Sequence, residues 1–162
     1  MKTIYRSFLS LLLATSLQAG SLFQQGNVSV GVNAGSGSVH VGVSKDYFVI
    51  GVRGDFFIYD NLSVGIGVSS WLGDDPTITE VTLPVTYYFD TNMRFYPYLG
   101  GFYRYSYYSG DYNDLSYTSV GGRAGISYSS GRGYAGVGVI GEYNVDTGES
   151  RFDPEMFVGI MF

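Results

Sequence analysis

The stretch PEMFVGIMF, residues 154–162, decides the fold. Counted back in twos from the last residue, one set is entirely apolar: Phe162, Ile160, Val158 and Met156. The residues between them include a charge, Glu155, and a glycine, Gly159. Because successive side chains of a β-strand point to opposite faces, this alternation predicts a strand with one continuous apolar face that ends on an aromatic residue.

The same alternation recurs from about residue 26 onward, and turn residues interrupt it at intervals. We interpret the pattern as eight strands: 26–35, 47–58, 62–72, 77–89, 94–108, 115–129, 133–145 and 154–162. A strand that crosses a membrane needs about 9–11 residues, and these runs are of that order. No stretch keeps the 3.6-residue period of an amphipathic helix.

The second face of these strands carries a few isolated charges flanked by Gly and Ser. They are Arg53, Asp55, Glu80, Arg104, Arg123, Glu142 and Glu155. A soluble sandwich or lipocalin-like barrel would need many more surface charges than the 14 % found here. In hydrocarbon, only a closed barrel satisfies every backbone group of a sheet. The pattern therefore predicts an all-β, eight-stranded, antiparallel up-and-down transmembrane barrel, with its apolar face toward lipid and its charges in the lumen.

The connections alternate between short and mostly longer segments. Those at 60–61, 90–92 and 131–133 are tight, whereas those at 36–46, 73–76, 109–114 and 146–153 are mostly longer and more acidic. Barrels of this kind pair short periplasmic turns with longer extracellular loops. We therefore expect the tight turns and both ends of the barrel to face the periplasm.

Residues 1–19 have the features of a secretory signal peptide. Lys2 and Arg6 precede a short apolar run, and Ala19 is a plausible cleavage point, which leaves a barrel domain at 20–162. The run is too short for a membrane anchor, the alternative interpretation. Without the two signal-peptide cations, seven basic residues oppose fourteen acidic ones, and this excess argues against a nucleic-acid partner. The chain has no Cys, which excludes disulfides and thiolate metal sites.

The chain after the signal peptide resembles the small eight-stranded outer-membrane barrels of the OmpA/OmpX-like superfamily. The resemblance rests on the alternation of residues 156–162, the YDNLS turn at 59–63 and the YPYLGG strand start at 96–101. It implies a monomer in the outer membrane of a Gram-negative bacterium, surrounded by lipids and lipopolysaccharide. It further implies that periplasmic chaperones and the barrel-assembly machinery handle the chain. The assembly signal would be Met156, Val158, Ile160 and Phe162.

Function does not transfer with this resemblance, because such barrels serve adhesion, envelope stability, small pores and resistance to host defences. The connecting loops here are short for an adhesive member. With no periplasmic domain expected after Phe162, a cell-wall tether is unsupported. We expect a non-enzymatic barrel with a structural or surface-interaction role.

The seven inward charges are the main candidate site. Charges in so narrow a lumen must pair, since an unpaired buried charge costs several kcal/mol. A network that ties strands together is one interpretation, and the gate of a narrow channel for ions or small solutes is the alternative. The inward glycines could receive inward aromatic side chains, or could leave pockets for water. The glycines are Gly31, Gly51, Gly65, Gly67, Gly100, Gly121, Gly125, Gly136 and Gly138, and the aromatics Trp71, Tyr88, Tyr98, Phe102 and Tyr134.

Aromatic residues gather near both ends of the predicted strands, as in interfacial girdles. Toward the turns we expect Tyr59, Tyr87, Phe89, Phe95, Tyr96, Tyr128 and Phe162; toward the loops, Tyr47, Trp71, Tyr105, Tyr107, Tyr108, Tyr117 and Tyr143. A platform that stacks sugars or nucleotides is the alternative. Two features fit the barrel poorly: small residues on the lipid face (Gly101, Gly122, Gly141 and Ser70), and Pro84, which calls for a bulge or a membrane-edge position.

The predicted loops are acidic but match no calcium-binding spacing, so we expect them to be solvated and the protein to hold no metal or cofactor. Their carboxylates are Asp46, Asp74, Asp75, Asp111, Asp114, Asp146, Glu149 and Asp153, against Lys45 and Arg151. Divalent ions that bridge lipopolysaccharide phosphates remain an alternative. A distant alternative is a lipid-modifying hydrolase built on the only histidine, His40, with Ser36, Ser38 or Ser44 nearby.

Overall fold

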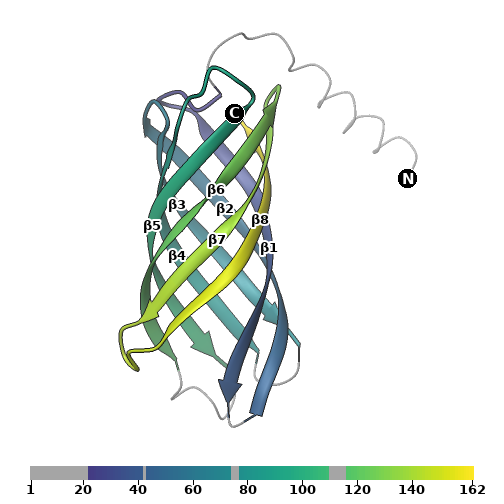
Figure 1. Cartoon of the computed structure of the whole chain (residues 1–162), viewed down its shortest axis with the longest axis vertical. Helices are drawn as coiled ribbons and strands as arrows, with labels where there is room; N and C mark the ends of the chain where they lie inside the picture. The colour runs from purple at the N-terminus through teal and green to yellow at the C-terminus, as the bar shows by residue number, and fades with distance from the viewer. Residues whose placement is uncertain (1–21, 42, 74–76, 110–115) are drawn as a thin grey trace, which may run out of the picture.

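The chain forms a closed barrel in which every strand pairs antiparallel with its neighbour in sequence and the last pairs with the first. The computed structural model describes residues 22–41, 43–73, 77–109 and 116–162, with the side chains of 35–47 left out of the description. The strands are β1 (Val28–Val41), β2 (Val43–Tyr59), β3 (Leu62–Leu72), β4 (Ile78–Tyr88), β5 (Phe95–Tyr108), β6 (Tyr117–Ser130), β7 (Gly133–Asn144) and β8 (Ser150–Met161). They tilt steeply around the barrel axis (Figure 1). The predicted fold class is confirmed.

No helix in the described part of the chain is long and apolar enough to cross a membrane.

Two predicted loops are wrong, because strand pairing continues through them. β1 and β2 pair from Val28↔Phe56 to Val41↔Val43, so the predicted loop at 36–46 is almost entirely strand. Backbone pairing does not depend on side-chain alternation, and the Gly- and Ser-rich sequence there hides the strands. In the predicted loop at 146–153, β8 already begins at Ser150.

Pro154 explains why the start of β8 was placed too late. A proline suggests a strand boundary, because it cannot donate to the ladder. Here Pro154 pairs with Val139 of β7, whereas the pairing of β8 with β1 reaches only as far as Glu155↔Gly35. Pro154 therefore lies one residue beyond the end of the β1–β8 pairing. On that side of β8 no strand needs a backbone N–H from it.

Pro84 causes neither a bulge nor a shift of register. Along the β3–β4 ladder, Val64 pairs with Val85 and Gly67 pairs with Thr82 in the same register. The two residues of each strand between these pairs have no partner in that ladder. Pro84 faces inward and pairs with Phe102 of β5 on its other side. The missing N–H is thus accommodated by a local interruption of the β3–β4 ladder.

The outer wall is apolar, as the alternation predicts. Val52, Leu83 and Val137 are 59, 50 and 54 % exposed, and similar side chains surround the barrel. The outward glycines Gly101, Gly122 and Gly141 are partners in one row across β5, β6 and β7. On β8 the ring of Phe152 covers Gly141. An apolar belt on a closed barrel is the surface that a bilayer requires.

The tight turns lie at the barrel end that carries the C-terminus, which we call the turn end; the opposite end is the loop end (Figure 1). Asn61, Asn92 and Gly131 occupy the left-handed region, with φ of 65, 57 and 60°. Asn and Gly tolerate these dihedrals, which tight hairpin turns demand.

The orientation of the barrel can be tested with single cysteines, since the chain has none of its own. A cysteine at Ser109 or Ser150, at the loop end, should react on intact cells with a membrane-impermeant thiol reagent. One at Asn92, at the turn end, should react only after the outer membrane is permeabilised. The opposite pattern would contradict the predicted orientation.

Candidate functional site in the barrel lumen

The structure places all seven predicted lumen charges inside the barrel, where they form three groups. The first lies nearest the turn end. Arg53 and Asp55, two residues apart on β2, share the inner face, and Arg53 Nη2 lies 2.7 Å from Asp55 Oδ1. Arg53 also donates to the hydroxyl of Thr86 at 3.1 Å, and Asp55 accepts from Ser29 Oγ at 3.4 Å. This pair therefore links β1, β2 and β4.

The second group joins β5, β6 and β8. Arg123 Nη2 lies 2.9 Å from Glu155 Oε2, and Arg123 Nε donates to Glu155 Oε1 at 3.0 Å, so the guanidinium fork meets the carboxylate with two nitrogens. The hydroxyl of Tyr98 donates to Glu155 Oε1 at 2.7 Å. The Arg123 guanidinium also lies 5.2 Å from the ring centre of Tyr98 and 5.4 Å from that of Phe157.

The third group, toward the loop end, is a cluster of two arginines and two glutamates. Arg104 Nη1 lies 2.6 Å from Glu142 Oε2 and 3.4 Å from Glu80 Oε2. Arg151 Nη2 approaches the same two carboxylates, at 2.8 Å for Glu142 and 3.1 Å for Glu80. Arg151 Nε also pairs with Asp153 at 3.2 Å. We call Arg104, Arg151, Glu80 and Glu142 the four-residue cluster.

Arg151 and Asp153 are therefore lumen residues, and their assignment to a loop was wrong. The reason is the early start of β8, which turns both side chains inward. The Arg151 guanidinium lies 4.7 Å from the ring centre of Trp71. The sequence did contain a signal, because Arg151, Asp153 and Glu155 have the same parity.

Hydroxyl groups also donate hydrogen bonds to the carboxylates in the cluster. Ser119 donates to Glu142 at 2.6 Å, and Ser106 donates to Glu80 at 3.3 Å. Arg104 Nε donates to Thr82 at 3.0 Å. Glu80 and Glu142 are only 2 and 4 % exposed, so these bonds must offset much of the cost of removing two charges from water.

Aromatic side chains pack directly against several of the inward glycines, as predicted by the interpretation that these glycines make room for inward aromatic rings. A Cβ added at Gly138 or Gly125 would meet the hydroxyl of Tyr98, and one at Gly121 would meet the ring of Phe102. Other glycines receive other groups: Gly65 lies under the carboxylate of Asp55.

The lumen also holds space for water. Two cavities of about 50 Å³ each lie between the charged groups, and the lining of both includes Asn33, Ser69, Arg104 and Glu155. A cavity needs only about 10–15 Å³ of space of this kind to hold a water molecule, so each has room for ordered water. One inward glycine, Gly67, lines one of these cavities, and its occupation by water stays a prediction.

Two buried aromatic clusters lie near the ends of the lumen, and they correct the predicted girdles. At the loop end, Trp71 and Tyr108 are buried with Ile78, and Tyr117 packs against them. At the turn end, Tyr96 is buried inside the barrel. These four residues therefore do not belong to an outer girdle. Of the predicted girdle residues, those that the structure shows exposed are Tyr59, Tyr87, Phe89, Phe95, Tyr128 and Phe162 at the turn end and Tyr105, Tyr107 and Tyr143 at the loop end.

The turn-end cluster contains a residue that the sequence did not single out. Phe23 is fully buried among Phe57, Tyr88, Tyr96 and Tyr134. It precedes the first strand, where period two provides no guidance. The only sequence signal is an aromatic residue between the predicted signal peptide and β1.

The predicted assembly signal lies on the outer wall. Met156, Val158 and Phe162 are 55, 58 and 65 % exposed, and Ile160 is half-buried. Their recognition by an assembly machinery stays a prediction.

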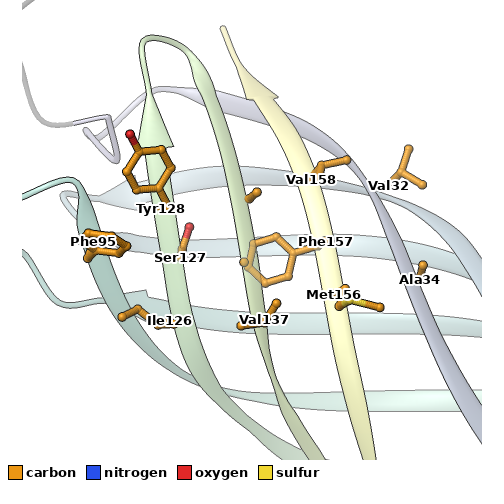
Figure 2. A pocket seen from close by; sticks show the side chains of 12 residues that line it. Val32, Ala34, Phe95, Ile126, Ser127, Tyr128, Val137, Met156, Phe157 and Val158 are labelled. Carbon is orange, nitrogen blue, oxygen red and sulfur yellow. The ribbon is translucent and has the colours of Figure 1, made fainter.

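A shallow apolar hollow of about 450 Å³ lies beside this row on the outer wall. Figure 2 shows Val137 and Met156 between Ile126 on one side and Ala34 on the other. These four are partners in one row across β6, β7, β8 and β1. Because the lining is almost entirely apolar and the hollow opens on the outer wall, bilayer hydrocarbon can fill it, and it indicates no separate ligand.

The predicted loop sites fall largely outside the described residues. Asp74, Asp75, Asp111 and Asp114 lie there, as do the side chains of Tyr47, Lys45, Asp46, His40, Ser36, Ser38 and Ser44. Across the described part of the chain, no group of three or more His, Cys, Asp or Glu residues is placed to hold a metal ion. Asp146 instead accepts a hydrogen bond from the backbone N–H of Thr118 at 2.8 Å.

No protein-family model and no curated protein matches the chain. Solved structures do. The N-terminal β-barrel domain of Pseudomonas aeruginosa OprF superposes with a TM-score of 0.70 and 17 % identity, over 85 % of this chain and 98 % of that one. Neisserial surface protein A superposes with a TM-score of 0.64 and 14 % identity, over 85 % of this chain and 96 % of that one. Ail, the attachment invasion locus protein of Yersinia pestis, superposes with a TM-score of 0.53 and 14 % identity, over 86 % of this chain and 100 % of that one.

These identities are too low to transfer an activity, but the three structures share one architecture. Together with the apolar belt and the charged lumen, they show that this chain has the fold of the small eight-stranded β-barrels of the bacterial outer membrane.

Proposed function

We propose that the protein is a non-enzymatic outer-membrane barrel with a structural or surface-interaction role. The observation that carries the proposal is a lumen that side chains fill except for two small cavities. Three groups of paired charges cross it, and aromatic clusters lie near both ends. The barrel acts as a monomer among outer-membrane lipids and lipopolysaccharide, after delivery by periplasmic chaperones and the barrel-assembly machinery.

Several of the ion pairs support a structural role because they join different strands across the lumen. Arg104 on β5 binds Glu142 on β7, and Arg123 on β6 binds Glu155 on β8. Pairs such as these resist changes of strand register, in addition to the backbone ladder. A rigid, closed barrel of this kind would hold its loops in fixed positions at the cell surface.

A narrow channel is the second candidate, and one observation favours it. Arg104 and Arg151 share the same two carboxylates, Glu80 and Glu142. Because either arginine can neutralise either glutamate, the pairs could exchange without leaving a charge unpaired. Such an exchange could open a path between the two small cavities.

Conductance separates the two functions. The purified barrel, refolded and inserted into planar lipid bilayers, should show no stable single-channel steps, because side chains fill its lumen. A matched recording with Arg132→Ala, whose side chain is exposed in a tight turn, should be equally silent. Reproducible steps from the unmodified chain would favour the channel and contradict the structural proposal.

A further inference from the structure

The segment just before β1 folds back into the turn end of the barrel. Phe23, within Leu22–Asn27, is 0 % exposed, although it lies outside every strand. Its ring stacks on Tyr88, with centroids 4.1 Å apart and planes 10° apart. The ring also meets Tyr96 edge-on at 4.8 Å and Tyr134 at 5.9 Å. One aromatic side chain is thus enclosed by rings from several strands.

Backbone hydrogen bonds hold the same segment in place. The carbonyl of Phe23 accepts from the N–H of Asn61 at 2.6 Å, in the β2–β3 turn. The N–H of Gly26 donates to the carbonyl of Phe57 at 2.8 Å, and the N–H of Gln25 donates to Asp60 Oδ1 at 2.9 Å. Gly26 has a φ of +89°, which suits glycine and allows the chain to turn from the segment into β1.

The position of the segment relates it to the lumen charges. Tyr134, which the Phe23 ring touches, donates to Ser29 at 3.0 Å, and Ser29 donates to Asp55. Tyr134 and Ser29 therefore connect Phe23 with the Arg53–Asp55 pair. At the other side, the socket includes Met161, close to the C-terminus. The segment lies at the barrel end that holds the C-terminus (Figure 1).

We propose that the turn end is a peptide-binding socket, that Leu22–Asn27 occupies it in cis, and that Phe23 acts as a stopper closing the lumen at this end. The socket consists of Phe57, Tyr88, Tyr96, Tyr134 and Met161. The stopper is held by side-chain stacking and by backbone bonds, but no strand ladder includes it. It can therefore leave while the barrel stays closed, and its departure opens the socket that leads toward the Arg53–Asp55 pair. The proposal stands whether or not the whole lumen conducts.

The test measures access to the socket from solution. Ser63, on the inner face of β3, is 0 % exposed and pairs with Phe57. In the otherwise cysteine-free chain, Ser63→Cys in detergent should react slowly with a small charged methanethiosulfonate reagent. Adding Phe23→Ala should accelerate labelling at least tenfold, because an open socket admits the reagent. Phe23→Leu, which keeps most of the apolar volume, should give a smaller acceleration.

The matched control is Phe95→Ala, an exposed outward aromatic at the same end, which should leave the labelling rate unchanged. Folding of each variant is checked by the gel shift between folded and unfolded barrel. Equal labelling rates in folded Phe23→Ala and the parent would overturn the proposal. If Phe23→Ala does not fold, Phe23→Leu decides: parent-like labelling of that folded variant would equally overturn it.

Discussion

Replacing Arg104 with Ala should lower the free energy of unfolding by about 3–5 kcal/mol, the cost typical of breaking a buried ion pair. Arg104 lies between two carboxylates, at 2.6 Å from Glu142 and 3.4 Å from Glu80. Without it, Arg151 alone would face both. Because Arg151 also pairs with Asp153, the loss of Arg104 would add one uncompensated negative charge in a narrow, poorly hydrated space. The measurement is urea unfolding in lipid vesicles, followed by the gel shift between folded and unfolded barrel.

The choice of control depends on the structure. Arg151 appeared from sequence to be a loop residue, but it belongs to the four-residue cluster and cannot serve. Arg132 is exposed in the β6–β7 turn and can serve as the control. Arg132→Ala should change the free energy of unfolding by less than about 0.5 kcal/mol. Identical urea midpoints for Arg104→Ala and Arg132→Ala would show that the cluster contributes nothing at this position.

Replacing Gly138 with Ala should destabilise the barrel by about 3 kcal/mol, at the upper end of the range for overpacking. A Cβ at Gly138 would overlap the hydroxyl of Tyr98 and the backbone oxygen of Ala124. Tyr98 would have to move, and its hydrogen bond to Glu155 would be lost with it. The added methyl group thus disturbs packing and the second charged group together. The same urea titration measures the effect.

Gly67 supplies the matched control, since it is also an inward glycine in a strand. A Cβ there would lie 3.5 Å from the carbonyl oxygen of Val52 and 3.8 Å from Cβ of Arg53, which are ordinary contacts. Gly67→Ala should therefore leave stability within about 0.5 kcal/mol of the parent. If the two alanine variants unfold alike, the contact between Gly138 and Tyr98 does not constrain the barrel.

Sequence reasoning was most successful where side-chain alternation is strict. Residues 62–72 were predicted as a strand with the bounds that β3 has in the structure. Reasoning failed where alternation is weak or ambiguous. The Gly- and Ser-rich run at 35–38 conceals the continuation of β1, and Pro154 conceals the start of β8. Both are positions where backbone pairing, rather than side-chain polarity, sets the strand length.

By itself, the sequence determined the number of strands, the closed antiparallel order and the inward position of the seven predicted lumen charges. Period two assigns every residue of a strand to one face, and a lipid environment requires a closed sheet. Only the tertiary structure decided which inward groups meet. Glu80 and Arg151 come from opposite walls of the barrel, on β4 and β8, and Phe23 lies outside every strand. Such meetings depend on the stagger between strands and on the path of a chain end, and neither quantity is encoded in the alternation of polar and apolar residues.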